Sequence, residues 1–309
     1  MDYSNRINMD SITINNNIKL SNDSSTPKSI TVSLNALSQL SDFKRLISQV
    51  FSTVRKESPV LFWIVIACFL LAVGCLPGLL IDDRTIMGIN VWLKPLKFSI
   101  STAIYVLTVG YLITLYPYSN RKKWIINGII AWTLFIELGI IIYQGAMGVQ
   151  SHYNMSSQID ALLFASMGIL IAINVLIMIL FIFDTIRLKL KTEKSIQWAI
   201  LIGWMVVFFG SWIGGQMISQ MAHNVGVADG GAGLPFLNWS TIAGDLRIAH
   251  FFGLHGIQII PLFALWMSKR WKTISRNQII AVTVFGLFYA AWIGYTFYQA
   301  KQGIALLGM

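Results

Sequence analysis

The sequence predicts an all-α membrane protein, a polytopic bundle of about seven transmembrane helices. Two observations on composition and one on arrangement lead to this fold class. The mean hydropathy is +0.65, and only 12% of the 309 residues are charged, whereas a soluble domain carries about 25%. The apolar residues gather in runs of about 20, which is long enough to cross a hydrocarbon core. Because lipid offers no partner to backbone N–H and C=O groups, such runs must be helical.

The chain before the first apolar run divides into two parts. Residues 1–33 are rich in Asn, Ser and Asp and predict a disordered segment, because they can bury little apolar surface. Residues 34–57 place apolar side chains at helical spacing beside basic ones and predict an amphipathic helix on the membrane surface. A solvated helix packed on the bundle is the alternative. Residues 58–309 are the predicted seven-helix transmembrane domain.

Seven spans follow from the hydropathy pattern, and each is long enough to cross a bilayer. They cover residues 59–81, 97–116, 124–148, 160–183, 196–221, 246–268 and 278–299. Several tryptophans fall near span ends, where their rings suit the headgroup region. Gly210 and Gly214 in the fifth span, with Gly253 and Gly256 in the sixth, predict close packing between helices.

The connections between these spans alternate in charge. Those near 117–123, 184–195 and 269–277 hold eleven Lys or Arg residues and two acids, whereas the opposite connections and the C-terminal tail hold five basic and five acidic residues. Because basic loops stay on the cytoplasmic side, we expect the N-terminus in the cytoplasm and the C-terminus outside.

Charge and cysteine content exclude two further classes. The net charge of +10 does not indicate a nucleic-acid partner, because the basic residues flank apolar runs; the expected partner is the lipid bilayer. Cys68 and Cys75 lie seven residues apart on one helix face. Two helical turns are too far for an undistorted disulfide, so we expect core thiols and no redox pair.

All histidines of the chain fall at the outer end of the predicted bundle. They are His152, His223, His250 and His255. Glutamines accompany them at helical spacing on the third, fifth and sixth spans, namely Gln144, Gln220 and Gln258. Polar stripes in a bilayer face the bundle interior or line a wet cavity. We therefore expect these side chains to converge in one pocket, with the histidines as metal ligands and the glutamines as cofactor-binding groups.

Three charged residues near the predicted pocket are the candidates for catalysis. Glu137 is the deepest acid, near the middle of the third span, where an unpaired carboxylate is costly. It is expected to act as an acid or base, or else to form a buried hydrogen bond that orders the bundle. Arg247 is the candidate anion clamp, and Asp245 beside it is the candidate second carboxylate.

Two outer connections have unusual sequences. The string WLKPLKF at 92–98 places Lys94 and Lys97 around a proline. These lysines could attract an anionic headgroup or substrate, but the favoured interpretation is that they only extend to the surface. Residues 219–261 contain the turn sequences DGG and GLP. They predict a compact outer loop, either a lid over a cavity or a tight surface turn.

Three strings carry a resemblance. They are WLKPLKF at 92–98, QGAMGVQSHYN at 144–154 and AHNVGVADGGAGLPFLNWSTIAGDLRIAHFFGLHGIQIIPL at 222–262. Together they resemble a family of bacterial multi-pass membrane proteins, over residues 80–260. The resemblance implies a protein of the bacterial cytoplasmic membrane, and it brings no activity or site residues with it. Where the QGxxG string of that family carries an arginine, this chain has Met147.

Three functional hypotheses follow. The first is a membrane-embedded enzyme that acts on a lipid-soluble small molecule, with Zn or Fe held by three of the histidines and a carboxylate. The second is an electron carrier with haem between axial histidines. The third is a transporter or ligand-binding membrane protein in which the polar stripes form a solute path. The sequence contains no HExxH, CxxCH or HxxxH motif, so no zinc or haem motif favours the first two.

Overall fold

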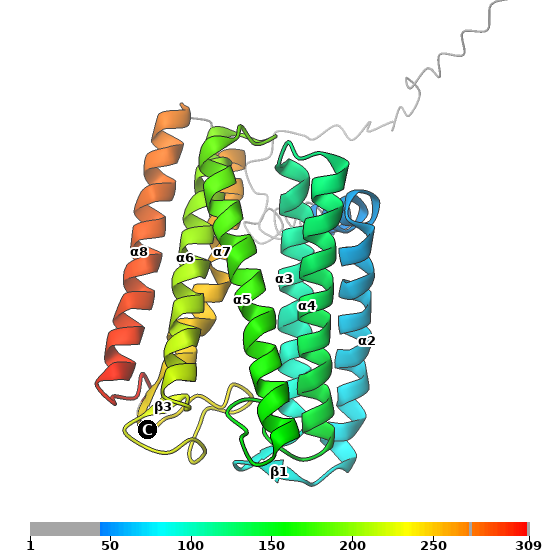
Figure 1. The fold of residues 1–309 in the computed structure, drawn as a ribbon. Helices are drawn as coiled ribbons and strands as arrows, with labels where there is room; N and C mark the ends of the chain where they lie inside the picture. Colours follow the sequence, from blue (N-terminus) through cyan, green and yellow to red (C-terminus); the bar gives the residue numbers. More distant parts are fainter. Residues whose placement is uncertain (1–43, 272–273, 308–309) are drawn as a thin grey trace, which may run out of the picture. The chain divides into compact units, whose positions relative to one another are not determined.

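The computed structural model describes residues 44–271 and 274–307. Residues 49–309 form one compact unit, and in its described part the fold is all-α with seven helices long and apolar enough to span a membrane (Figure 1). These are α2 (Pro59–Ile81), α3 (Leu93–Leu115), α4 (Asn120–Ala146), α5 (Gln158–Arg187), α6 (Lys194–Ser219), α7 (Leu246–Arg270) and α8 (Ser275–Lys301). The predicted seven-span bundle is therefore confirmed.

The chain before α2 is described only in part. Residues 44–57 are helical, and residues 1–33, the predicted disordered segment, lie outside the described residues together with the first part of the predicted 34–57 helix. Val54 is fully buried against Gly110 of α3. The Ser58 hydroxyl donates a 3.0 Å hydrogen bond to the Gly110 carbonyl, so the end of this helix is fixed to the bundle.

Consecutive helices pack against each other from α2 through to α8, and α6 also contacts α8. The α6–α7 pair is the closest, because glycines from the two helices face each other. A Cβ atom on Gly253 would lie 2.5 Å from the Cα atom of Gly210, and one on Gly203 would lie 3.1 Å from the Cα atom of Ile257. This confirms the predicted close packing at Gly210 and Gly253. Cys68 and Cys75 are buried free thiols, also as predicted.

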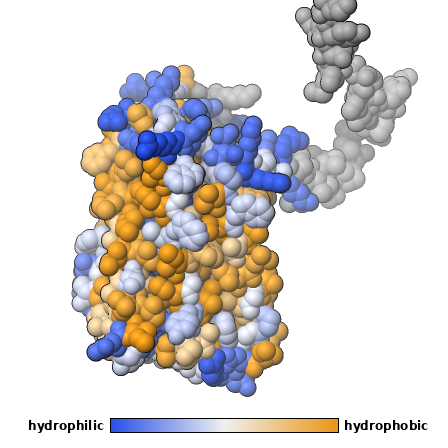
Figure 2. Space-filling model, turned by 45° about the vertical axis from the view of Figure 1, so that its right-hand side comes forward, coloured by the Kyte–Doolittle hydropathy of each residue, from blue (hydrophilic) through white to orange (hydrophobic). Residues whose placement is uncertain are grey.

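The surface has an apolar belt with polar residues at both ends of the helices. Figure 2 shows orange residues across the middle and blue residues gathered at the two ends. Exposed apolar side chains of this belt include Leu70, Leu176 and Phe288. A belt of this kind suits hydrocarbon on all sides, and the chain is an integral multi-pass membrane protein. We call the end with loops 117–119 and 188–193 the inner end and the opposite end the outer end, following the predicted orientation.

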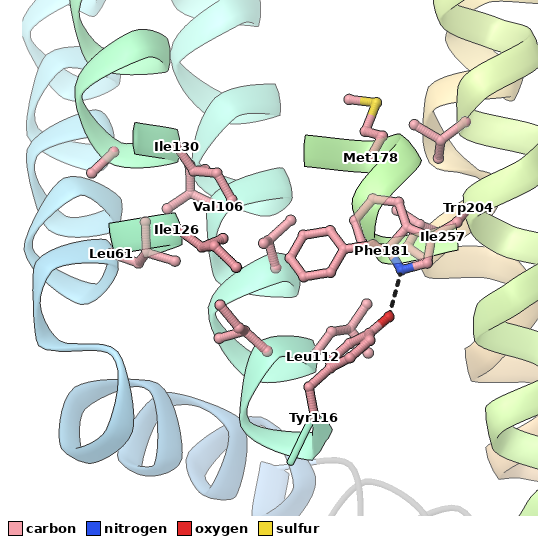
Figure 3. Close-up of a cluster of buried hydrophobic side chains, with 14 of the residues drawn as sticks. Leu61, Val106, Leu112, Tyr116, Ile126, Ile130, Met178, Phe181, Trp204 and Ile257 are labelled. Atoms are coloured by element: carbon pink, nitrogen blue, oxygen red, sulfur yellow. Dashed lines mark hydrogen bonds between the residues drawn. The ribbon is translucent and has the colours of Figure 1, made fainter. Parts of the chain in front are cut away.

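The inner half of the bundle is filled with aromatic side chains. Figure 3 shows Trp204 of α6 beside Phe181 of α5, and their rings stack with centroids 4.9 Å apart. The Trp204 indole donates a 3.2 Å hydrogen bond to the Tyr116 hydroxyl at the end of α3. Aromatic stacking and a satisfied indole N–H hold α3, α5 and α6 together.

Two short β-hairpins lie at the outer end. The first pairs β1 (Thr85–Ile86) with β2 (Ile89–Asn90), and the second pairs β3 (Asn224–Val225) with β4 (Gly244–Asp245). Met87 and Gly88 turn the first hairpin with φ of 51° and 78°, the conformation that two-residue hairpin turns favour. Between β3 and β4 the chain is held by backbone hydrogen bonds, Leu234 to Trp239 and Thr241 to Ala232. The predicted compact outer loop is confirmed.

Candidate functional site

A cavity of about 130 Å³ lies at the outer end, between the beginning of α3, the end of α4, the loop after α4 and the segment that links α6 to α7. Its polar lining comes from Asn90, Lys94, Lys97, Gln150, Ser151, His152, His223, Asp229, Asn238 and Arg247, and its apolar lining includes Ile86, Met87, Ile89, Val91, Pro95, Phe98, Ile141 and Val149. The volume is several times that of a water molecule, so one small ligand can fit. The β1–β2 hairpin supplies part of the apolar wall.

Lys94 and Lys97 reach the cavity from the first turn of α3. Pro95 lies between them, and proline is tolerated there because the first turn has no intrahelical partner for its missing N–H. The Lys94 ammonium lies 3.2 Å from Nδ1 of His152, and the Lys97 ammonium donates to the Leu237 carbonyl at 3.2 Å. In the described part of the chain, neither lysine has a carboxylate within 4.0 Å. Both lysines line the cavity and are half-buried, which favours the alternative that they attract an anionic group.

Arg247 is oriented by the N-cap of its own helix. The Asp245 carboxylate accepts from the Arg247 backbone N–H at 2.9 Å, and from its guanidinium through Nε at 2.9 Å and Nη2 at 2.6 Å. Nη2 also contacts the Asn238 carbonyl at 2.5 Å, while Nη1 has no partner among the described residues. Asp245 is only 1% exposed and does not line the cavity. It positions Arg247, which lines the cavity.

His152 lies in the loop after α4, where its Nδ1 is engaged. The Lys94 ammonium and the Ser151 hydroxyl are 3.2 and 3.1 Å from this nitrogen. Burial, the nearby Lys94 charge and the neighbouring imidazoles of His223 and His250 hold the pKa of His152 well below its ordinary value. His152 is therefore neutral near pH 7.

His223 forms a dyad with Asp229. The His223 Nδ1 and the Asp229 Oδ2 are 2.5 Å apart, and the carboxylate also accepts from the backbone N–H groups of His223 and Asn224. Burial outweighs the hydrogen bond to Asp229 and lowers the pKa of His223. For Asp229 burial raises the pKa, but the bonds from His223 and Asn224 outweigh it and bring the pKa to about 2. The dyad is thus a neutral imidazole on a carboxylate.

The two polar groups of α4 lie deeper than the cavity or beside it. Glu137 is 8% exposed and one helical turn below Ile141, which lines the cavity. It is coupled electrostatically to Lys94 and has no hydrogen-bond partner among the described residues. Gln144 is fully buried and donates to Asp160 at 3.3 Å, and its Oε1 has no partner.

The other candidates are engaged elsewhere. His250 contacts the Gly210 carbonyl at 2.8 Å in the α6–α7 interface, and His255 packs on Phe251 with ring centroids 4.4 Å apart. Gln220 donates to the Ala222 and Asn224 carbonyls, and Gln258 contacts Thr108. These four side chains do not line the cavity. Of the predicted convergence, the structure brings together His152, His223 and Arg247.

The predicted metal site finds no support in this geometry. Within residues 44–271 and 274–307, no three His, Cys, Asp or Glu side chains are grouped so that they could hold a metal ion. His250 contacts α6, and His255 packs on Phe251 of its own helix. The carboxylates of Asp229 and Asp245 are bound to His223 and Arg247. A haem between axial histidines does not fit either, because a cavity of about 130 Å³ is well below the size of usual cofactor pockets.

Three important residues of the cavity were not among the predicted site residues. For Lys94 and Lys97 an anionic ligand was considered but not favoured, although Arg247 lay at the same predicted level. Asp229 was read only as a turn residue. Its partnership with His223 depends on the fold of the outer loop, which no helical spacing reveals.

Comparisons with protein-family models, with curated proteins and with solved structures give no match. The classification that the structure supports is a multi-pass helical membrane protein with a basic, imidazole-containing cavity at its outer end.

Proposed function

We propose that the protein is a ligand-binding membrane protein whose outer cavity holds a small anion. This is the third of the sequence hypotheses, made more specific by the charge of the cavity lining. The observation that carries it is the meeting of Lys94, Lys97 and Arg247 in one cavity, where the two lysines have no acidic partner among the described residues.

Three cations so close together are costly without an anion. The charges of Lys94, Lys97 and Arg247 repel one another. Asp245 pairs with Arg247, whereas Lys94 and Lys97 feel the nearby carboxylates only from beyond ion-pair distance among the described residues. Partial burial removes some of the water that would screen them. A bound anion would replace that water, accept hydrogen bonds from both ammonium groups and from Nη1 of Arg247, and offset the repulsion. Charge-assisted bonds of this kind are about twice as strong as neutral ones.

The apolar part of the lining favours a small anion, or a larger ligand that places only its anionic group in the cavity. Phe98, Pro95 and Ile141 surround the cations, and such walls exclude water and strengthen the remaining electrostatic attraction. The acid–base role predicted for Glu137 stays a prediction, as does the lipid-soluble substrate of the enzyme hypothesis. Our proposal assigns neither metal nor haem to the cavity.

The test is anion binding by the purified full chain in nanodiscs of a zwitterionic lipid. Phosphate, sulfate and acetate would be titrated while the unfolding midpoint and the binding heat are recorded. We expect at least one oxyanion to stabilise the protein, and Lys97→Met to weaken its binding about tenfold, as loss of one charged hydrogen bond does. Lys301→Met is the matched control, since this exposed lysine lies at the same end. If no anion binds, or if both variants behave alike, the proposal fails.

A further inference from the structure

The two imidazoles of the cavity present opposite hydrogen-bonding character at Nε2. Both rings line the cavity, and both have Nδ1 engaged by a charged partner. No described residue bonds to Nε2 of either ring. The partner at Nδ1 therefore decides which Nε2 carries a proton, because a neutral imidazole has one N–H and one lone pair.

At His223 the partner is an acceptor. The Asp229 carboxylate is fully ionised near neutral pH and can only accept, so Nδ1 of His223 must donate the hydrogen. Nε2 of His223 is left with a lone pair. The ring is held in place by Tyr153, whose centroid is 5.0 Å away. The cavity thus contains a fixed hydrogen-bond acceptor among its cations.

At His152 the partner is a donor. The Lys94 ammonium has three N–H groups and no lone pair, so Nδ1 of His152 must accept. Nε2 of His152 therefore carries the hydrogen and donates. Besides the amide, hydroxyl and carboxylate groups of its lining, the cavity contains the ammonium groups of Lys94 and Lys97, the guanidinium of Arg247 and this imidazole N–H as donors. The imidazole of His223 adds an acceptor that no described residue uses.

We propose that the cavity selects oxyanions that still carry a hydroxyl group, with hydrogen phosphate, or the monoanion of a phosphate monoester, as the ligand class. This inference rests on the proposed function. The oxygens of such an anion would accept from Lys94, Lys97, Arg247 and His152, while its O–H would donate to Nε2 of His223. An anion of the same charge without a proton leaves that acceptor unpaired in a partly buried cavity, which a site penalises strongly.

Hydrogen phosphate and sulfate form the sharpest pair of probes. At about pH 8 both are dianions of similar size, and only hydrogen phosphate has a hydroxyl group to donate. In zwitterionic nanodiscs we expect phosphate to bind at least about tenfold more tightly than sulfate. Equal affinities would overturn this inference and leave the proposed function standing, whereas binding of neither ion would overturn the proposed function itself.

The phosphate group could come from solution or from a lipid headgroup, so a second arm separates the two sources. Nanodiscs doped with phosphatidic acid carry a phosphate monoester, whose monoanion has a hydroxyl on phosphorus, and those doped with phosphatidylglycerol carry a diester without one. If the headgroup is the ligand, phosphatidic acid will stabilise the protein more than phosphatidylglycerol and will compete with free phosphate. If free phosphate is the ligand, phosphate will bind equally in both preparations.

Asp229→Asn tests the tautomer directly. Asp229 Oδ1 accepts from the backbone N–H groups of His223 and Asn224 at 2.9 and 2.8 Å, whereas Oδ2 accepts one longer backbone bond, from His223 at 3.0 Å. The oxygen of an asparagine would therefore take the Oδ1 position. Its NH₂ group would then face Nδ1 of His223 and force the hydrogen onto Nε2. We expect the phosphate preference to disappear or reverse, while sulfate binding persists or improves. An unchanged preference would overturn the proposal.

A second variant covers the case in which Asp229→Asn fails to fold. His223→Phe removes the acceptor but keeps the ring and the backbone N–H that bonds to Asp229. It should bind phosphate and sulfate with equal affinity. Asp83→Asn, an exposed acid at the same end, is the matched control and should keep the wild-type preference. A phosphate preference that survives His223→Phe would place the selecting group elsewhere and contradict the inference.

Discussion

At the inner end of the bundle, Asp184 accepts hydrogen bonds from Lys122 and Tyr118 at 2.7 and 2.8 Å. At the outer end, the Lys94 and Lys97 ammonium groups contact an imidazole nitrogen and a backbone carbonyl and lie over the rings of Phe98 and Phe236, and neither pairs with a carboxylate of the described residues. The inner lysine is paired with a carboxylate and the aromatic rings beside it fill the space. The outer lysines face a cavity. Lysines therefore join helices at the inner end, where a carboxylate pairs with them, and line an open cavity at the outer end, where none does.

Hydrogen bonding at the inner end extends beyond this pair. The Tyr116 hydroxyl lies 2.6 Å from the Thr185 hydroxyl, and Gln197 donates to the backbone carbonyls of Thr185 and Leu188 at 2.8 Å. These bonds join α3, α5 and α6. A network whose members are all satisfied stabilises one arrangement of the helices, so we assign this end to stability and the outer end to ligand binding.

The largest expected effect comes from removing both outer lysines. In the double variant Lys94→Met, Lys97→Met, anion affinity should fall about a hundredfold, since each lost charged hydrogen bond contributes about tenfold. The unfolding midpoint without anion should stay the same or rise, because two like charges near Arg247 are gone. Calorimetric titration and thermal unfolding measure the two effects. A sharp drop in the unfolding midpoint would mean that these lysines stabilise the fold. The outer end would then serve stability as the inner end does, contrary to our account.

Asp184→Asn, at the inner end, should lower the stability of the protein without changing its affinity for anions. The side chain of Asp184 is 6% exposed and that of its partner Lys122 is 38% exposed, so solvent screens part of the interaction. We expect the free energy of unfolding to fall by about 2 kcal/mol, seen as a midpoint lower by several degrees. Anion affinity should be unchanged. Asp83→Asn is the control, and a loss of anion binding in Asp184→Asn would show that the two ends are not independent.

A smaller effect is expected from pH. The pKa of His152 is lowered from its ordinary value of 6.5, so the folded protein binds fewer protons than the unfolded chain below that pH. The stability that neutral, buried His152 contributes to the folded protein is fully present above about pH 6.5 and is lost as the pH falls below this value. The unfolding midpoint should therefore decline from pH 7 to pH 5, and His152→Gln should flatten the decline. Lys301→Gln should leave it as steep as in the wild type, and an equal flattening there would refute the assignment to His152.

The helices could be predicted closely because hydropathy is a local property of the sequence. The first predicted span, 59–81, coincides with α2 (Pro59–Ile81). The second was predicted to begin at 97, whereas α3 begins at Leu93. The error has a physical cause: Lys94 and Pro95 were read as residues of the connection, although proline fits the first turn of a helix. These four residues move Lys94 from a predicted connection into the first turn of α3, where it lies one turn before Lys97.

The site was harder to predict because loops build most of it. Helical spacing placed His152, His223 and Arg247 at one level, and the cavity confirms that they meet. The same spacing grouped His250 with them, but its Nδ1 contacts the Gly210 carbonyl where two glycines bring α6 and α7 together. Helical spacing shows which residues share a face, but it does not show which face packs against a neighbouring helix. The pairing of Asp229 with His223 depends likewise on backbone hydrogen bonds within a loop.

The most direct test of the central claim is to locate an oxyanion in the protein. Crystals or cryo-EM grids of the full chain in lipid would be prepared with arsenate, a heavy analogue of phosphate that also carries a hydroxyl group. Our account predicts density for the ion in the outer cavity, within hydrogen-bond distance of the Lys94 and Lys97 ammonium groups and the Arg247 guanidinium, and its loss in the double lysine variant. Arsenate bound only elsewhere, with ordered water alone between these three side chains, would contradict it.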